Sequence, residues 1–450
     1  MKNLEERNSI KDGEGSGYDG KNWGDNKACL SRREKMYSIP GYVDFELKGD
    51  TINIIDHLTK SVIEVNVSNK KELFSIYNSG SIAIRTDLEK FLFQHGVLDE
   101  KVKLAAKVNG KLESLSSKLN VTIMVTELCN FNCKYCYERK NPKAMSDEMM
   151  RSIVNFVSKQ VEEDKQLKAI NVVWIGGEPL LEKTKILKYG KMLKDLAESH
   201  GLKHSAEIST NGYFLDEEVF GELLSVGIRK YYIALDGKTH DYLRPLITGE
   251  GTSKAIFRNL IAIKRHYGKT EDFEIEIINN ILENNRDFIW YDKLKILIGD
   301  TEHFVFTVKT IDQLRKDYDA QSTANIVKRN KLLKEHYDYL EFIHMRTDRK
   351  SSSEYGLCKA GLKNGFVFRC DGLVVKCNSC LSYDFNNVGL IGYDDIKIDA
   401  EKNNKWIHKI DHESCISCKN VLKCGYNSCP KTRFNSQKCI NFSRRNYETI

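Results

Sequence analysis

The cysteines set the strongest limit on what this chain can fold into, because they are numerous and unevenly placed. The 450 residues contain 13 cysteines. Cys29 stands alone, Cys129, Cys133 and Cys136 form a close triplet, and all the others lie between residues 358 and 439. An odd number of thiols does not form a complete disulfide framework. Clustered cysteines in a reducing compartment instead indicate bound metal.

The N-terminus and the composition favour a cytoplasmic protein. The first residues, MKNLEERNSIKDGEGSG, have no apolar stretch behind their charges, so they are not a secretory signal. No apolar run is long enough to cross a bilayer, so we expect no membrane partner. The net charge of +7 is explained by a lysine-rich solvated surface. The alternative is a weak preference for acidic partners such as an acidic peptide; no nucleic-acid motif is present, so no nucleic acid is expected.

The N-terminal part of the chain divides into a tail and a small domain. Residues 1–37 are polar and glycine-rich, which predicts a flexible tail with Cys29 as a free thiol. Residues 38–110 contain GYVDFEL, TINIIDH and SVIEVNV, which read as three strands, followed by two helical stretches. This pattern predicts a small α+β domain.

The central part alternates strands and helices. Six strand candidates between residues 115 and 310 are separated by amphipathic stretches near 147–163, 181–199, 215–226, 253–267 and 284–297. The alternation predicts a parallel sheet with right-handed crossovers. Six βα units are too few for a closed eight-stranded barrel of about 250 residues, so we expect an α/β fold with a partial (βα)6 TIM-like barrel. Residues 311–350 predict a charged helical connector, and the cysteine-rich residues 351–450 predict an irregular C-terminal domain.

The cysteine triplet has a spacing suited to an iron–sulfur cluster. Cys129, Cys133 and Cys136 form a C-x3-C-x2-C run directly after an apolar strand. A cubane [4Fe–4S] cluster has four irons that thiolates ligate, so three thiolates leave one iron open. An open iron can chelate the amino and carboxylate groups of a small cofactor. The alternatives are a zinc site with a fourth ligand elsewhere and a nonspecific group of cysteines.

Further polar motifs follow the ends of the next predicted strands. WIGGEP, ISTNG, IALDG and DYLRP supply these candidates: Gly176, Gly177, Glu178, Ser209, Thr210, Asn211, Asp236 and Arg244. Because the carboxyl ends of parallel strands meet at one edge, where such folds bind ligands, we expect these residues to lie together. Taken singly, GGEP and NG are also ordinary turn sequences, and Asp236 and Arg244 could form a structural ion pair.

With these motifs in order, residues 119–310 resemble the radical SAM superfamily, whose signature is C-x3-C-x2-C with an aromatic residue before the last cysteine, here Tyr135. The resemblance implies a catalytic [4Fe–4S] cluster on the triplet and S-adenosylmethionine (SAM) as cofactor. It implies that Tyr135 packs near the adenine and that the GGEP motif binds the SAM amino group. Ser209, Thr210 and Asn211 would lie near the ribose and carboxylate, and Arg244 would contact the carboxylate.

The C-terminal cysteines resemble the SPASM extension of a subset of these enzymes. Cys358, Gly372 and Cys377 match its first element, and the later cysteines keep its C-x2-C-x5-C spacing, with one gap longer by a residue. The resemblance implies two auxiliary [4Fe–4S] clusters. One would use Cys415, Cys418, Cys424 and Cys439. The other would use Cys358, Cys377 and Cys429, with Cys370 or Cys380 as a fourth ligand or with one iron open; structural zinc is the alternative.

The resemblance predicts an oxidoreductase that acts on a peptide. One electron reductively cleaves SAM, and the 5′-deoxyadenosyl radical abstracts hydrogen from a ribosomally made precursor peptide, giving a thioether, a carbon–carbon cross-link or another oxidation. The small domain, winged-helix-like in pattern, could bind the leader peptide as an added strand, or be a plain capping domain. A low-potential flavodoxin or ferredoxin would supply electrons. A sulfatase-type maturing enzyme is the alternative, although Asn378 replaces its aspartate base; a zinc-stabilised peptide-binding scaffold is another.

Overall fold

The computed structural model describes most of the central part of the chain and portions of both ends. The described residues are 35–39, 43–56, 61–79, 81–100, 110, 116–136, 143–269, 271–282, 287–299, 302–311, 323–347, 358–381, 383–407 and 434. The predictions made for Cys29 and for the cysteines from Cys415 to Cys439 lie outside these residues. No helix among the described residues is both long and apolar enough to cross a membrane.

The N-terminal part contains the expected three strands followed by helices. An antiparallel sheet in the order β1-β2-β3 is formed by β1 (Val43–Lys48), β2 (Thr51–Asp56) and β3 (Ser61–Asn66). The short helix η1 (Val67–Asn69) and the helices α1 (Lys70–Ser79) and α2 (Asp87–Gln94) follow. Ile54, Leu73 and Leu92 are buried in a core of their own. Tyr37, placed in the tail by sequence, already pairs with Ile82 of this part.

The central part is a parallel sheet of six strands in sequence order, as the alternating pattern predicted. The strands are β4 (Lys118–Thr126), β5 (Ala169–Gly176), β6 (Lys203–Thr210), β7 (Ile228–Ala234), β8 (Glu274–Ile281) and β9 (Phe304–Thr310). Each connection contains a helix, and these are α4 (Asp147–Glu163), η2 (Pro179–Glu182) with α5 (Lys183–Ser199), α6 (Glu217–Ser225), η3 (Gly237–Thr239) with α7 (His240–Leu243) and α8 (Ser253–Tyr267), and α9 (Ile289–Ile298). The expected helices therefore form within a few residues of their predicted bounds.

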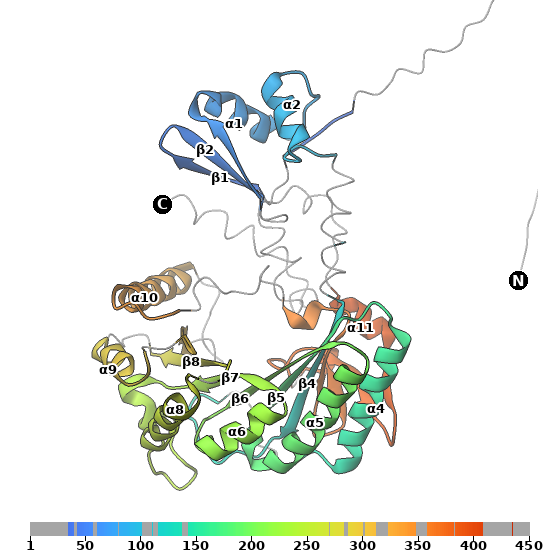
Figure 1. Cartoon of the computed structure of the whole chain (residues 1–450), viewed down its shortest axis with the longest axis vertical. Helices are drawn as coiled ribbons and strands as arrows, with labels where there is room; N and C mark the ends of the chain where they lie inside the picture. The colour runs from blue at the N-terminus through green and yellow to red at the C-terminus, as the bar shows by residue number, and fades with distance from the viewer. Residues whose placement is uncertain are drawn as a thin grey trace, which may run out of the picture.

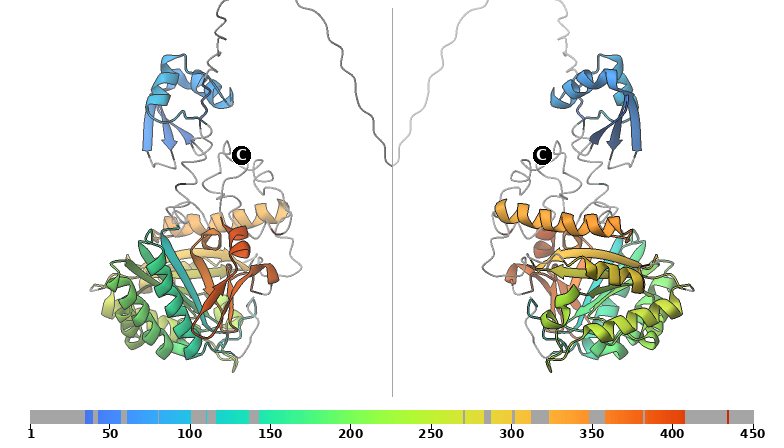
Figure 2. Two further views of the ribbon diagram at one scale, coloured as in Figure 1. Left: turned by 90° about the vertical axis from the view of Figure 1, so that its right-hand side faces the viewer. Right: turned by 90° about the vertical axis from the view of Figure 1, so that its left-hand side faces the viewer.

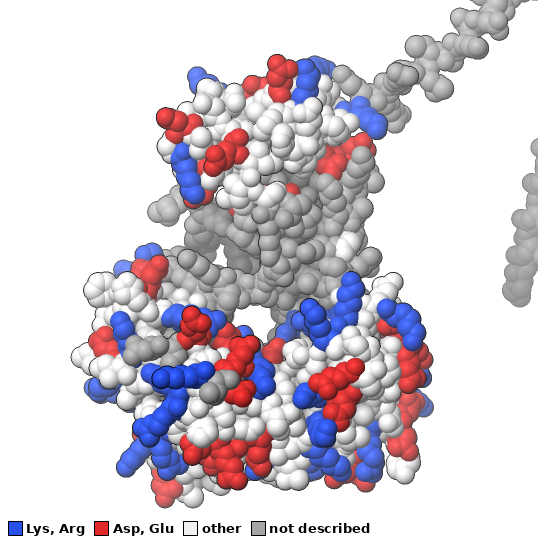
Figure 3. All heavy atoms as spheres, in the orientation of Figure 1, with Lys and Arg blue, Asp and Glu red and all other residues white. Residues whose placement is uncertain are grey.

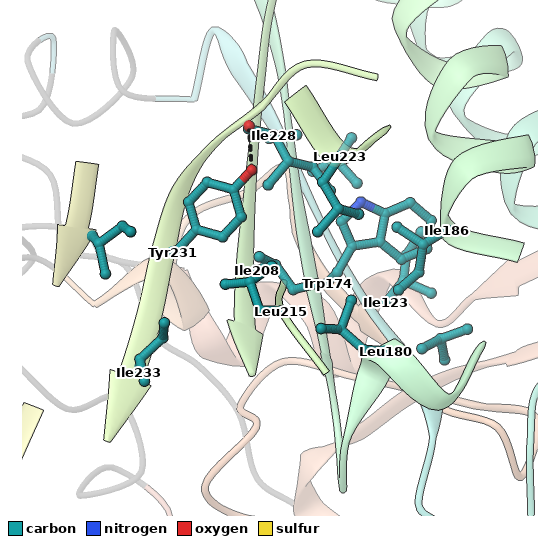
Figure 4. Close-up of a cluster of buried hydrophobic side chains, with 14 of the residues drawn as sticks. Ile123, Trp174, Leu180, Ile186, Ile208, Leu215, Leu223, Ile228, Tyr231 and Ile233 are labelled. Atoms are coloured by element: carbon teal, nitrogen blue, oxygen red, sulfur yellow. Dashed lines mark hydrogen bonds between the residues drawn. The ribbon is translucent and has the colours of Figure 1, made fainter. Parts of the chain in front are cut away.

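The main hydrophobic core lies between this sheet and the helices that cover one of its faces (Figure 1). Trp174 of β5 is fully buried against Ile186 of α5 and Leu223 of α6, with Ile208 beside it (Figure 4). Alternate residues of each strand point to this face, because side chains alternate along a strand. The residues between them point to the opposite face, which is therefore free to carry polar groups.

The helical connector and the C-terminal part complete the sheet. Helix α10 (Thr323–Phe342) lies beside β9, where the Tyr337 hydroxyl accepts a hydrogen bond from the Val308 amide at 3.1 Å (Figure 2). After η6 (Lys359–Gly361), strand β10 (Gly365–Phe368) pairs parallel with β4, on the side away from β5. Strands β11 (Leu373–Val375), β12 (Asn387–Ile391) and β13 (Ile396–Ile398) extend the sheet antiparallel, with η7 (Asp384–Asn386) and α11 (Ala400–Trp406).

Residues 358–407 therefore differ from the irregular structure that the sequence predicted. Their strands join the central sheet, which has ten strands among the residues that the structure describes. Strands of three to five residues are too short to show a clear alternation in the sequence. Strand β10 is stabilised by pairing with β4 and by packing on the main core, where its Phe366 and Phe368 contact Phe156 of α4, and β11 to β13 pair in turn beyond it. On the face shown in Figure 3, acidic and basic side chains are interspersed, as the solvated-surface interpretation expects.

Candidate functional site

The loop that carries the cysteine triplet follows β4 and is held by the segment after β7. The Asn132 amide donates to the Pro245 carbonyl at 2.8 Å, and the Lys134 amide donates to the Leu243 carbonyl at 2.9 Å. The Phe131 amide also donates to the Cys129 sulfur at 3.4 Å. Backbone contacts from a distant segment thus fix the course of the loop.

A cavity of about 470 Å³ opens beside this loop, at the carboxyl ends of the central strands. The predicted site residues that line it are Cys129, Cys133, Tyr135, Cys136, Gly176, Gly177, Ser209, Thr210, Asn211 and Arg244. Motifs that are far apart in the sequence therefore share one cavity. Sequence reasoning did not find the remaining lining residues, which are Glu127, Phe131, Tyr232, Ala234, Ile278, Asn280, Lys309, Thr310 and Ser379.

Two glycines bring β5 and the cysteine loop into direct backbone contact. A Cβ atom on Gly176 would collide with the carbonyl oxygen of Thr126, and one on Gly177 would collide with that of Leu128. The Gly177 amide donates to Thr126 at 2.9 Å. Any side chain at these positions would push the start of the cysteine loop outward, so glycine is required by the close approach.

Glu178 lies behind the cavity wall and is not among the residues that line it. Its carboxylate accepts from the Thr210 hydroxyl and the Asn211 amide, both at 2.7 Å, and from the Leu180 amide at 3.0 Å. Burial raises the pKa of Glu178, although these hydrogen bonds oppose the shift. In this structure the carboxylate therefore fastens the end of β6 to the end of β5.

Asp236 and Arg244 are linked through Tyr135. The Tyr135 hydroxyl donates to the Asp236 carboxylate and accepts from Arg244 Nη1 at 2.9 Å. The Asn280 side chain donates to the same carboxylate at 2.9 Å. No direct ion pair between Asp236 and Arg244 occurs among the described residues. The structural ion pair that the sequence suggested as an alternative is therefore replaced by an indirect link through the Tyr135 hydroxyl. Burial raises the pKa of Tyr135, so its hydroxyl keeps its proton.

The residues of the cavity fit an iron–sulfur cluster with a small anionic ligand. Arg244 Nε, Thr310 Oγ1 and Asn130 Nδ2 are buried at or beside the cavity and have no hydrogen-bond partner within the described structure. Burial raises the pKa of Cys129 to about 11, so metal binding there releases a proton. In the described part, no three His, Cys, Asp or Glu side chains form a group for a single metal ion. A cubane is wider than an ion, and each thiolate ligates a different iron.

Four of the C-terminal cysteines lie in the described residues. Cys370 and Cys380 are buried, whereas Cys358 and Cys377 are partly exposed. The Asn386 side chain holds the turn from Cys377 to Cys380: it accepts from the Cys377 amide and donates to both carbonyls. Ser379 of the same turn reaches the cavity. Which of Cys370 and Cys380 serves as a ligand stays a prediction, because Cys429 lies outside the described residues.

Comparison with known proteins agrees with this geometry. Residues 123–289 match the Radical SAM superfamily. An uncharacterised protein of Methanocaldococcus jannaschii is 27% identical over 149 residues, which are 33% of this chain and 49% of that protein. A serine-type anaerobic sulfatase-maturating enzyme of Klebsiella pneumoniae is 24% identical over 145 residues, 31% of this chain and 35% of the enzyme. The chain therefore spans half or less of the length of these relatives.

Among solved structures, the fold is similar to that of native anSMEcpe with bound AdoMet and Cp18Cys peptide. The TM-score is 0.50 at 23% identity, and the match covers 68% of this chain and 88% of that one. This likeness shows the fold, a large parallel sheet consistent with a partial TIM-like barrel. The family match covers the strands that surround the cysteine cavity, so residues 123–289 form a Radical SAM superfamily domain.

Proposed function

We propose that this chain is a radical SAM enzyme that oxidatively modifies a peptide. The observation that carries the proposal is a single cavity that joins three thiols, two glycines in backbone contact and an arginine whose Nε is buried. A Radical SAM domain implies SAM and a [4Fe–4S] cluster as cofactors. A bound cluster and SAM supply a reducing electron and the 5′-deoxyadenosyl radical.

The residues of the cavity have distinct parts in this proposal. Cys129, Cys133 and Cys136 would ligate three irons. The partnerless Arg244 Nε offers a donor for the SAM carboxylate, and its Nη1 is occupied by Tyr135. Ser209, Asn211 and the two glycines would face the nucleotide. A preformed, partly closed cavity excludes water from a radical that would otherwise react with any nearby bond.

A peptide substrate is supported by the relatives and by the N-terminal sheet. The Klebsiella relative is named as maturing a sulfatase, and the similar solved structure holds a peptide. In the described residues, β1 and β3 are the edges of the three-stranded sheet. An edge strand offers free backbone groups to which an extended leader peptide can add as a further strand. The C-terminal cysteines would hold the two auxiliary clusters, and a flavodoxin or ferredoxin would donate electrons.

A sulfatase-type maturing activity is the second candidate. The similarity to the Klebsiella enzyme favours it. Asn378 argues against it, because its carboxamide follows Cys377 where a base is needed, and an amide does not accept a proton at neutral pH. Sulfatase peptides that are oxidised at the active-site residue would establish this candidate.

The test is an analysis of protein purified without oxygen. About 8–12 irons per chain with equal sulfide, and the release of 5′-deoxyadenosine from SAM and dithionite, are expected. Incubation with a short precursor peptide, sought among the reading frames beside the gene for this chain, should then change the mass of the peptide by the loss of hydrogen. Bound zinc without iron would instead support the scaffold alternative and refute the proposal.

A further inference from the structure

The side of the sheet opposite the covering helices is divided into an apolar half and a charged half. Near β4, β5, β10 and β11 it carries a small hydrophobic cluster that contains Met124, Ile175 and Val375. On β6, β7 and β8 it carries charged and hydroxyl groups instead. In the strand register Tyr232 is paired with Ser209 and Glu276, and Lys230 is paired with Glu207 and Glu274. The residues Glu207, Ser209, Lys230, Tyr232, Glu274 and Glu276 therefore form a continuous polar group across three strands, called the charged column below.

This column separates two cavities. Tyr232 lines the cysteine cavity at the carboxyl ends of the strands. Glu207, Lys230 and Glu274 line a second cavity of about 840 Å³ near the amino ends. Since β6 and β7 are parallel neighbours, Glu207 and Tyr232 form the boundary between the two spaces. The second cavity also contains titratable side chains that can exchange protons with water, among them His204.

One hydrogen bond crosses this boundary. The Tyr232 hydroxyl donates to Glu207 Oε2 at 3.0 Å. Burial raises the pKa of Tyr232, and the Glu207 charge raises it further, so the hydroxyl holds its proton and remains a donor. Lys359 Nζ lies 3.4 Å from both carboxylate oxygens of Glu207. Lys359 directly follows Cys358, so the carboxylate is also tied to the C-terminal cysteine segment.

The reaction proposed above must release a proton. When a substrate carbon radical bonds to a thiol sulfur, the C–S bond forms and the S–H bond breaks. One electron then leaves to an acceptor of the iron–sulfur class, and one proton leaves to a base. Asn378 cannot be this base. Among the described residues that line the cavity, Glu127 carries a carboxylate, but that carboxylate is paired with Arg369 at 3.1 Å. The Tyr232 oxygen can accept one while it passes its own proton to Glu207.

We propose that Tyr232 and Glu207 form a proton relay that carries the proton released by substrate oxidation from the cysteine cavity to the second cavity. The proposal rests on the proposed function. The substrate proton moves to Tyr232 Oη, the Tyr232 proton moves to Glu207 Oε2, and Glu207 delivers it to water at the amino ends of the strands.

The experiment measures how well SAM cleavage is coupled to product formation. Wild type, Tyr232→Phe and Glu207→Gln are incubated in D₂O with SAM, dithionite and the same precursor peptide. Each variant keeps the shape of its side chain and removes one proton-transfer group. Glu274→Gln is the matched control, because this carboxylate lines the second cavity but bonds to Lys230 and Arg346.

In both relay variants we expect modified peptide per 5′-deoxyadenosine to fall by about tenfold or more. The stalled substrate radical is then reduced by dithionite and takes a solvent deuteron, so unmodified peptide gains one carbon-bound deuterium. The control should keep the wild-type ratio and gain no deuterium.

Three outcomes contradict the relay. If both rates fall together in the variants, the pair has a structural role only. If modified peptide per 5′-deoxyadenosine stays at the wild-type value in the relay variants, another group takes the proton. If Glu274→Gln lowers this ratio equally, the effect is general to the charged residues of β6, β7 and β8. If the wild type cleaves SAM but modifies no peptide, the proposed function is refuted, and the relay with it. A wild type that modifies the peptide, with variants that give one of the three outcomes above, refutes the relay alone.

Discussion

Cys129, Cys133 and Cys136 share one cavity but differ in exposure, since Cys136 is exposed and the other two are partly buried. If all three ligate one cluster, the loss of any one thiolate should release it. We expect Cys129→Ser to lower the iron content by about four per chain and to abolish 5′-deoxyadenosine formation. Cys29→Ser is the control and should leave both unchanged. Iron retained in full by Cys129→Ser would show that the triplet is not a cluster site.

Space is tightly restricted at Gly177, where a Cβ would collide with the Leu128 carbonyl oxygen and lie 2.7 Å from that of Glu127. We expect Gly177→Ala to displace the loop at Leu128, to lower the free energy of unfolding by about 1–3 kcal/mol and to reduce the bound iron. Gly190→Ala is the matched control, because a Cβ there meets Val226 at an ordinary distance of 3.4 Å and alanine favours helix α5. Denaturant unfolding and iron analysis measure both effects, and equal behaviour of the two variants would contradict the steric explanation.

At the scale of single residues, the sequence predicted only some of the residues that line the cavity. Motifs at strand ends brought the cysteines, the glycines and Arg244 together, because strand ends must meet at one edge. That the motif of Glu178 binds the SAM amino group stays a prediction; in the structure its carboxylate accepts from Thr210 and Asn211. Tyr232 lies within a strand, where no motif distinguishes a cavity tyrosine from a core tyrosine such as Tyr231.

Among the elements, the short pair η3 and α7 positions Arg244, and a buried histidine holds it in place. His240 Nδ1 accepts from the Asp236 amide at 3.1 Å, and Nε2 lies 3.0 Å from the Thr252 hydroxyl. That hydroxyl donates to the Arg244 carbonyl at 2.8 Å. The ring must therefore be neutral with its proton on Nε2. Burial lowers the pKa of His240 to about 3, and Arg244 contributes to the shift.

This element should be sensitive to acid. The folded pKa is below the unfolded value of 6.5, so the stabilisation is complete above about pH 6.5 and is lost as the pH falls toward about 3. Between about pH 7.5 and about pH 5.5 we expect the wild type to lose about 1 kcal/mol through this group. His240→Gln, which does not titrate, should lose correspondingly less in urea unfolding. Identical pH dependence of the two proteins would contradict the assignment.

The elements of the C-terminal part show why the sequence could not give the whole fold. The central strands and helices are long enough for their periodicity to be read, and they formed where predicted. Strands β10 to β13 are short, and β10, which joins them to the central sheet, pairs with β4 far away in the sequence. The Asn120 amide beside this pair donates to the Asn364 carbonyl. Such pairings depend on tertiary contacts that local patterns do not contain.

For the whole molecule, the proposal assigns leader recognition to the N-terminal sheet and chemistry to the cysteine cavity. Val62 of β3 is 56% exposed although it lies in a strand, which suits an edge that binds a further strand. We expect the leader peptide to slow hydrogen exchange in Ser61–Asn66, as measured by mass spectrometry. A peptide of scrambled sequence is the control. Protection confined to the large sheet would contradict strand addition.

The pairing of β10 with β4 has a consequence for the order of events during synthesis of the protein. The strand that precedes the cysteine loop receives its second neighbour from a segment more than two hundred residues downstream. While the ribosome is still translating the intervening part, one edge of β4 is unpaired. The loop that carries the three thiols is then not yet surrounded by its final neighbours. Metal insertion by the cellular assembly machinery would then follow the completion of the chain rather than accompany its synthesis.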